Sequence, residues 1–146
     1  MQLPVTFDRD FFVFRYLVSH SELALRSVEG DADDRIEIKF YSVFGMKLKT
    51  KYRSPELGYA DDAQRREMLE LTGLEGANAA RVHVMALRSG DGEGLVACVG
   101  FTVYSHPNAP SADAYVSGDP VLIASHRTAA PGSGPGAAGL SGSTRS

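Results

Sequence analysis

The residues best suited to chemistry are the lysines, because all four lie between positions 39 and 51. Three of them occupy every second position: Lys47, Lys49 and Lys51. Residues Met46 to Arg53 have the alternation of a β-strand, in which side chains two positions apart point to the same face. Three ammonium groups and the Arg53 guanidinium are therefore expected to project from one side of a strand, where they would attract anionic groups.

This lysine strand has two interpretations that the sequence leaves open. Closely spaced ammonium groups on a rigid strand would bind an acidic protein surface, anionic lipid or nucleic-acid phosphate. Lysines also protect exposed strands from edge-to-edge aggregation, and Glu37 on the preceding predicted strand would compensate their charge across a hairpin. For the first interpretation, the predicted partner-binding residues are Lys39, Tyr41, Lys47, Lys49, Lys51 and Arg53.

Serine–histidine pairs are a second candidate for chemistry. Three of the four histidines follow a serine, in Ser19-His20, Ser105-His106 and Ser125-His126. Adjacent residues of a strand point to opposite faces, so these pairs predict no contact between the hydroxyl and the imidazole. The chain also lacks a Gly-x-Ser-x-Gly nucleophile elbow, and we predict no catalytic residue.

The histidines at 20, 83, 106 and 126 have no metal-ligand spacing, and Cys98 has no cysteine or histidine at a zinc-type interval. We therefore expect no metal and no cofactor. As the single cysteine, Cys98 excludes an internal disulfide, which fits a reducing compartment. It lies in the most apolar segment of the chain, which indicates a small, inert core residue.

The strands that must position these residues are predicted from alternation. Phe11 to Val18 is apolar on both faces, whereas Glu22 to Val28 and Arg35 to Tyr41 alternate between apolar and polar side chains. Small polar residues between the first two of these strands predict a hairpin. A turn at Phe44-Gly45 predicts that the third strand and the lysine strand form a second hairpin.

The second half of the chain begins with a helix signal. Asp61 stands at an N-cap position, and Gln64 completes a capping box, which predicts a helix from about Asp62 to Thr72. The remaining predicted elements are a hairpin of the strands Ala80 to Arg88 and Leu95 to Tyr104, and short edge strands at Ala114 to Val116 and Val121 to Ala124.

These elements predict an α+β fold: a mainly antiparallel curled sheet or partly open barrel of six to seven strands with one short helix. Since one helix cannot cover a flat sheet with strands that are apolar on both faces, we expect curling, a second layer or a homodimer. Residues 1–127 are expected to form a single domain. Residues 128–146, rich in Gly, Pro, Ser and Ala, are expected to be a disordered tail.

Composition limits the class of partner. The formal net charge is −3, and residues 1–126 carry 13 cations against 18 acids, a charge of −5. An anionic body disfavours nucleic-acid binding, which depends on a broad positive field. The chain has no apolar run long enough to cross a membrane and no recognisable secretory signal, so we expect a soluble, cytoplasmic protein.

The function predicted from the sequence is a non-enzymatic protein-binding module, such as an accessory or immunity-like protein, that docks an acidic partner through the lysine strand. The alternative is a small-molecule carrier or small enzyme whose apolar pocket lies inside the curled sheet, lined by Phe12, Phe14, Tyr16 and Phe101. Nucleic-acid binding through Lys47, Lys49, Lys51 and Tyr52 is less favoured.

Overall fold

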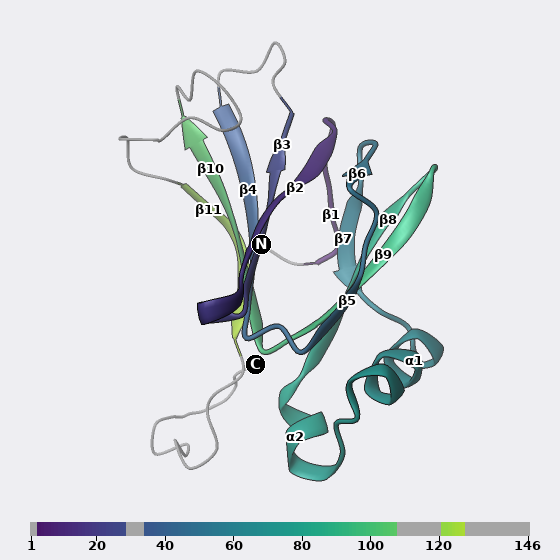
Figure 1. Cartoon of the computed structure of the whole chain (residues 1–146). Helices are drawn as coiled ribbons and strands as arrows, with labels where there is room; N and C mark the ends of the chain where they lie inside the picture. The colour runs from purple at the N-terminus through teal and green to yellow at the C-terminus, as the bar shows by residue number, and fades with distance from the viewer. Residues whose placement is uncertain (1–2, 29–33, 108–120, 128–146) are drawn as a thin grey trace.

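The computed structural model describes residues 3–28, 34–107 and 121–127, which form two antiparallel sheets facing each other (Figure 1). Sheet A has the order β1-β7-β8-β9-β5, with the bounds Val5–Thr6 (β1), Glu56–Tyr59 (β7), His83–Ser89 (β8), Gly92–Cys98 (β9) and Gly45–Lys47 (β5). Sheet B has the order β11-β10-β4-β3-β2-β6, with the bounds Val121–Arg127 (β11), Gly100–Pro107 (β10), Asp34–Tyr41 (β4), Glu22–Ser27 (β3), Phe11–Leu17 (β2) and Lys51–Tyr52 (β6). The sheets are curled and not closed into a barrel, and the α+β fold class is confirmed.

The meander β2-β3-β4 follows the predicted strands closely. A short 3-10 turn, η1 (Val18–His20), joins β2 to β3, and Ser21 closes it with a left-handed backbone, φ 49°. Along β4, Ile36, Ile38 and Phe40 are buried in the core, so the residues between them face away from sheet A. The predicted hairpin of β8 and β9 is also present.

Two predicted strands are divided between the sheets. The run Leu95 to Tyr104 breaks at Val99, so that β9 belongs to sheet A and β10 to sheet B. The lysine strand, Met46 to Arg53, divides into β5 of sheet A and β6 of sheet B, and β5 pairs with β9 instead of forming the predicted hairpin with β4. Figure 1 shows the sheets diverging from the end where β9 passes into β10.

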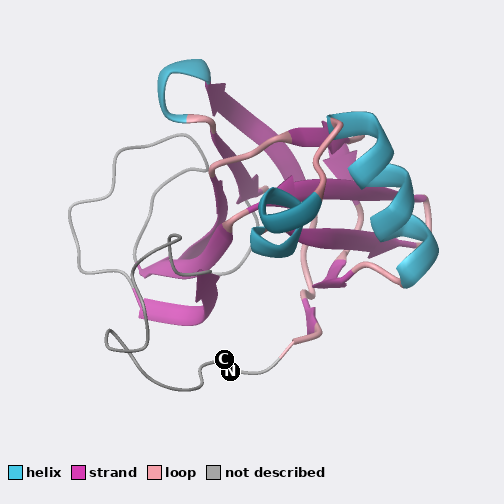
Figure 2. Cartoon of the chain, turned by 90° about the horizontal axis from the view of Figure 1, so that it is seen from below, coloured by secondary structure: helices cyan, strands magenta, loops and turns pink. Residues whose placement is uncertain are grey.

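The predicted helix is confirmed as α1, Asp62–Thr72. Asp61 and Gln64 form the full capping box, and Gly73 ends the helix at φ 73°. A second helix, α2 (Gly76–Arg81), occupies positions where the strand beginning at Ala80 was expected. Seen from below, the α-helices lie on the sheet A side of the molecule (Figure 2), and α1 contacts β5, β8 and β9.

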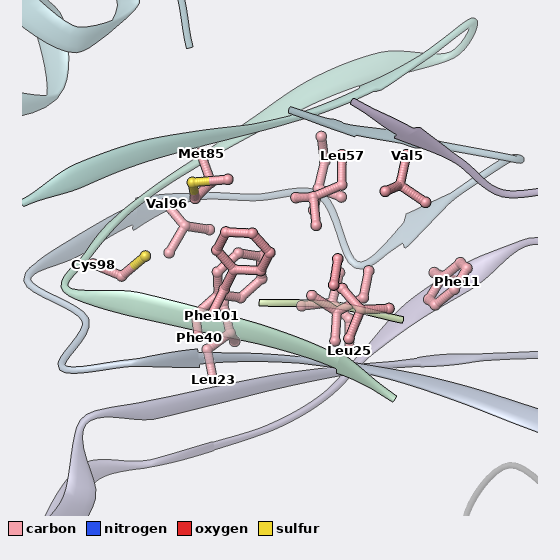
Figure 3. Close-up of a cluster of buried hydrophobic side chains, with 14 of the residues drawn as sticks. Val5, Phe11, Leu23, Leu25, Phe40, Leu57, Met85, Val96, Cys98 and Phe101 are labelled. Atoms are coloured by element: carbon pink, nitrogen blue, oxygen red, sulfur yellow. The ribbon is translucent and has the colours of Figure 1, made fainter. Parts of the chain in front are cut away.

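The main core fills the space between the sheets. Phe40, Phe101 and Leu25 from sheet B pack against Val96 and other side chains of sheet A (Figure 3). A smaller cluster under α1, centred on the fully buried Met68, covers the other face of sheet A. The strand β9 contributes to both clusters, so the expected second layer is present and β9 is covered on both sides.

Some predictions fall outside the described residues: the tail 128–146 and the edge strand at Ala114 to Val116. The division into a single domain at 1–127 and a tail therefore stays a prediction. Among the described residues, no helix is long and apolar enough to span a membrane.

Candidate functional site

The predicted lysine strand is wrong as a single surface, because its three lysines lie in different surroundings. Lys47, on edge strand β5, forms an ion pair with Glu67 of α1. Lys49 lies between β5 and β6, where its Nζ donates to the carbonyl of Asp91 at 2.6 Å and lies 3.3 Å from the Asp91 carboxylate. Lys51 is on β6 in the other sheet.

The division has a physical reason, which is that residues 48–50 carry the chain from sheet A to sheet B. Tyr52 reaches back across this crossover, is 1% exposed, and accepts a hydrogen bond from the backbone N–H of Lys49 at 2.7 Å. Its hydroxyl lies over Gly94, where a Cβ atom would come within 2.2 Å of it. The aliphatic stem of Lys49 is similarly close to Gly92. Lys47 and Lys49 therefore fasten the crossover and α1.

A different set of cations gathers on the outer face of sheet B, the face turned away from sheet A. Register places one row straight across the sheet: Lys51, Phe12, Arg26, Glu37 and Tyr104. A neighbouring row contains Arg15, Ala24, Lys39 and Thr102. We define the cationic face as Arg15, Arg26, Arg35, Lys39 and Lys51, which share this side of the sheet with the carboxylates Glu22 and Glu37.

Glu37 lies at the centre of the cationic face and is 4% exposed. The Arg26 Nε donates to its carboxylate at 2.7 Å, and the Lys39 Nζ lies 3.8 Å from it. The Lys39 Nζ also lies 3.8 Å from the Glu22 carboxylate. A buried carboxylate needs such partners, because an unpaired charge in this position would be strongly destabilising. Glu37 thus holds Arg26 and Lys39 in place.

His106 lies on the other side of Glu37, with its Nε2 3.8 Å from the carboxylate. Burial lowers the pKa of His106, the carboxylate of Glu37 opposes that shift, and the nearby cations Arg35, Arg26 and Lys39 add to it. The imidazole is therefore neutral at neutral pH, and His106 adds no positive charge beside Glu37.

A β-bulge brings an aromatic ring into the cationic face. The pairing of β2 with β3 shifts between Val13 and Arg15, leaving Phe14 as the extra residue. The Arg26 guanidinium lies 3.6 Å from the centroid of the Phe14 ring, and the Arg15 guanidinium lies 5.6 Å from it. Among the described residues, these cation–π contacts cover the outward-facing Phe14 ring with the two guanidinium groups.

The six residues predicted to bind a partner are thus separated. Lys39, Tyr41 and Lys51 lie on the outer face of sheet B, where the Tyr41 hydroxyl is 3.0 Å from Thr102 Oγ1. Lys47 and Lys49 do not, and Arg53 is an exposed residue that follows β6. Sequence reasoning missed the arginines at 15, 26 and 35, although the last two stand at outward-facing positions of strands that it predicted.

The aromatic residues proposed to line a pocket do not share one space. Phe12 and Phe14 lie on the outer face of sheet B, Tyr16 is 36% exposed, and Phe101 packs in the core at 2% exposure. Cys98 is completely buried, and burial raises the pKa of its thiol to about 12. It has the properties of the inert core residue that was expected.

One histidine contact differs from the prediction, and another joins the two sheets. Ser19 and His20 do touch, with Oγ and Nδ1 3.0 Å apart, because they lie in the η1 turn and not in a strand. His83 of sheet A packs edge-to-face on His126 of sheet B, with ring centroids 4.3 Å apart. Burial, His126 and Arg65 lower the pKa of His83 to about 4. Within the described ranges, no group of three or more side chains is arranged to hold a metal ion.

Comparison with known proteins identifies no relative: no family model, no curated protein and no solved structure matches the chain.

Proposed function

We propose that the chain is a non-enzymatic binding module that docks an acidic surface of a protein partner on the cationic face of sheet B. The observation that carries this proposal is the row Lys51, Phe12, Arg26, Glu37 and Tyr104, which brings two cations, two aromatic side chains and one carboxylate together on one side of five adjacent strands. Arginine and aromatic residues are enriched in protein interfaces, where a few of them carry most of the binding energy.

The face has a fixed part and an accessible part. Arg26 and Lys39 are held by Glu37, and Arg26 is stacked on Phe14, so these side chains lose little freedom when a partner binds. Arg15 and Lys51 are exposed, and neither forms an ion pair with a described residue. An acidic partner would therefore contact Arg15 and Lys51 first and settle on an ordered surface.

Charge distribution supports the same proposal. The chain has a formal charge of −3, yet the outer face of sheet B carries more cations than carboxylates. Such an asymmetric distribution orients an acidic partner before contact and raises the rate of association. The single, buried Cys98 is consistent with the cytoplasmic location that forms part of this proposal.

Single-stranded nucleic acid is the second candidate, because aromatic and basic residues interleaved on a sheet face can stack bases and contact phosphates. The observation against it is that the Arg26 guanidinium already lies over the Phe14 ring. Tyr52, which the sequence suggested for this role, is buried.

The experiment compares three variants, Arg15→Glu, Lys51→Glu and Arg66→Glu, each of which changes the charge by the same amount at an exposed position. The last is the control, since Arg66 lies on α1 away from the cationic face. Partners recovered from the source organism by pull-down should be lost with the first two and retained with the control. Retention by all three would refute the proposal, and loss of the wild-type partner on nuclease treatment would favour nucleic acid.

A further inference from the structure

The strand β2 is paired along its length on one side only. On one side it pairs with β3 from Phe11 to Leu17. On the other, β6 pairs only with Phe11 and Phe12, and the Val13 N–H donates to the Thr50 carbonyl at 2.9 Å. Beyond that point, no described residue pairs with the Phe14 to Leu17 stretch on this side. Alternate residues of an antiparallel strand point their backbone N–H and C=O groups to each side, so within the described part of the chain this stretch presents an open sheet edge.

The side chains beside the open edge differ between the two faces of the sheet. Arg15 and Lys51 lie on the outer face and are exposed. Tyr16 is the register partner of the core residue Leu23 and is 36% exposed, so it lies on the inner face. A strand added here would run beside β2 from the point where the chain turns away at Thr50. Arg15 and Lys51 would lie on its outer side and the Tyr16 ring on its inner side.

We propose that an extended acidic segment of the partner adds to the edge of β2 as a further strand of sheet B. This inference rests on the proposed function and specifies its binding mode. Backbone hydrogen bonds to the Phe14 to Leu17 stretch supply affinity, and alternate side chains supply specificity. Acidic residues at every second position meet Arg15 and Lys51, and apolar residues between them meet Tyr16.

Charge complementarity selects this occupant over a second copy of the chain. Two copies joined through their β2 edges would bring Arg15 of each toward the other, and like charges on adjoining strands repel. An acidic segment would instead be attracted to Arg15, because its charge is opposite. A purely protective role for the edge, with the bulge at Phe14 and the charge of Arg15 preventing association, predicts no binding at all.

The test uses three end-blocked peptides of alternating glutamate and valine, titrated into isotopically labelled protein and followed by amide resonances. One peptide is unmodified, one is N-methylated at every glutamate, and one is N-methylated at every valine. An added strand uses only one edge of the peptide, so one methylated peptide should bind as well as the parent, and the other at least about tenfold more weakly. The largest shifts should lie at Phe14 to Leu17.

Equal binding of both methylated peptides, loss of both, no binding of the parent, or shifts confined to other residues would overturn strand addition. After such a result, the proposal of acidic docking still holds if Arg15→Glu weakens binding of the native partner. If Arg15→Glu leaves that binding unchanged, both proposals are refuted. A lysine–valine peptide that binds as tightly as the glutamate–valine peptide would refute the acidic occupant. Concentration-dependent protection of the β2 amides without peptide would assign the edge to a second copy, and a stronger response to oligodeoxythymidine would assign it to nucleic acid.

Discussion

Cations form part of both the crossover at residues 48–50 and the outer face of sheet B, but the sequence brings them together differently in the two regions. At the crossover, Lys47 at the end of β5 and Lys49 lie two positions apart in the sequence, and each pairs with a different acidic residue of the chain itself, Glu67 or Asp91. On the outer face, cations distant in sequence come together by strand register. In this protein, cations that are clustered in the sequence are therefore not the ones that cluster on the outer face of sheet B.

The two regions also differ in what makes them stable. The outer face is organised around a buried carboxylate that needs its cations, whereas the crossover is organised around a tyrosine that fits against a glycine. In the crossover the ion pairs are exposed on both partners, so solvent screens them. The consequence is that charge should matter most for stability on the outer face, and close packing should matter most at the crossover.

The largest effect is expected from Glu37→Ala. It leaves Arg26 and Lys39 without their common carboxylate, and removal of one partner from a buried ion pair should cost about 4 kcal/mol of unfolding free energy. The matched control is Glu67→Ala, which removes the exposed partner of Lys47 and should change stability by no more than about 0.5 kcal/mol. Urea denaturation of both variants measures the difference. Equal losses would mean that the two regions use charge in the same way.

The next effect is expected from Gly94→Ala. The added methyl group would overlap the Tyr52 hydroxyl and displace that side chain. Overpacking and loss of the hydrogen bond from the Lys49 N–H should lower the free energy of unfolding by about 3 kcal/mol. Gly90→Ala is the control, because a Cβ at that position meets nothing within 4 Å. Thermal melting should lower the midpoint of the first variant only. An unchanged midpoint for Gly94→Ala would show that Tyr52 does not fix the crossover.

The smallest effect concerns pH. The pKa of His106 is lower in the folded chain than its ordinary value of 6.5, so the unfolded state binds more protons, and stability is lost as pH falls below 6.5. His106→Gln should make the unfolding free energy less dependent on pH in this range, which urea denaturation at a series of pH values measures. The dependence that remains belongs to His83, whose pKa is about 4. An unchanged pH profile for His106→Gln would mean that the imidazole does not titrate with folding.

Local signals in the sequence were sufficient for the elements that depend on local chemistry. The capping box of Asp61 and Gln64 predicts the start of α1. An apolar aromatic run predicts β2, and alternation predicts β3 and β4, each within one or two residues. What failed was the partition of strands between sheets. An apolar run such as Leu95 to Tyr104 has the same pattern whether or not the chain changes sheet at Val99.

The candidate site was predicted in part for a related reason. Alternation predicts outward positions for Lys39, Tyr41 and Lys51, and all three lie on the outer face of sheet B. Lys47 and Lys49 were included wrongly on that face, since nothing local reveals that Tyr52 turns back over Gly94. The bulge that places Phe14 beside Arg26 depends on pairing between strands, and no pattern within β2 predicts it.

The pairing of β4 with β10 has a consequence for how the polypeptide matures. During synthesis the β2-β3-β4 meander leaves the ribosome well before β10, whose Tyr104 completes the row beside Glu37. Until β10 is made, β4 is an unpaired edge strand of the meander, although it is a central strand of the finished sheet. Closing so long a stretch of chain is slow compared with forming a hairpin. Until β10 has been made, the backbone of β4 is unpaired on that side, and an unpaired strand edge is the kind of surface through which folding intermediates associate.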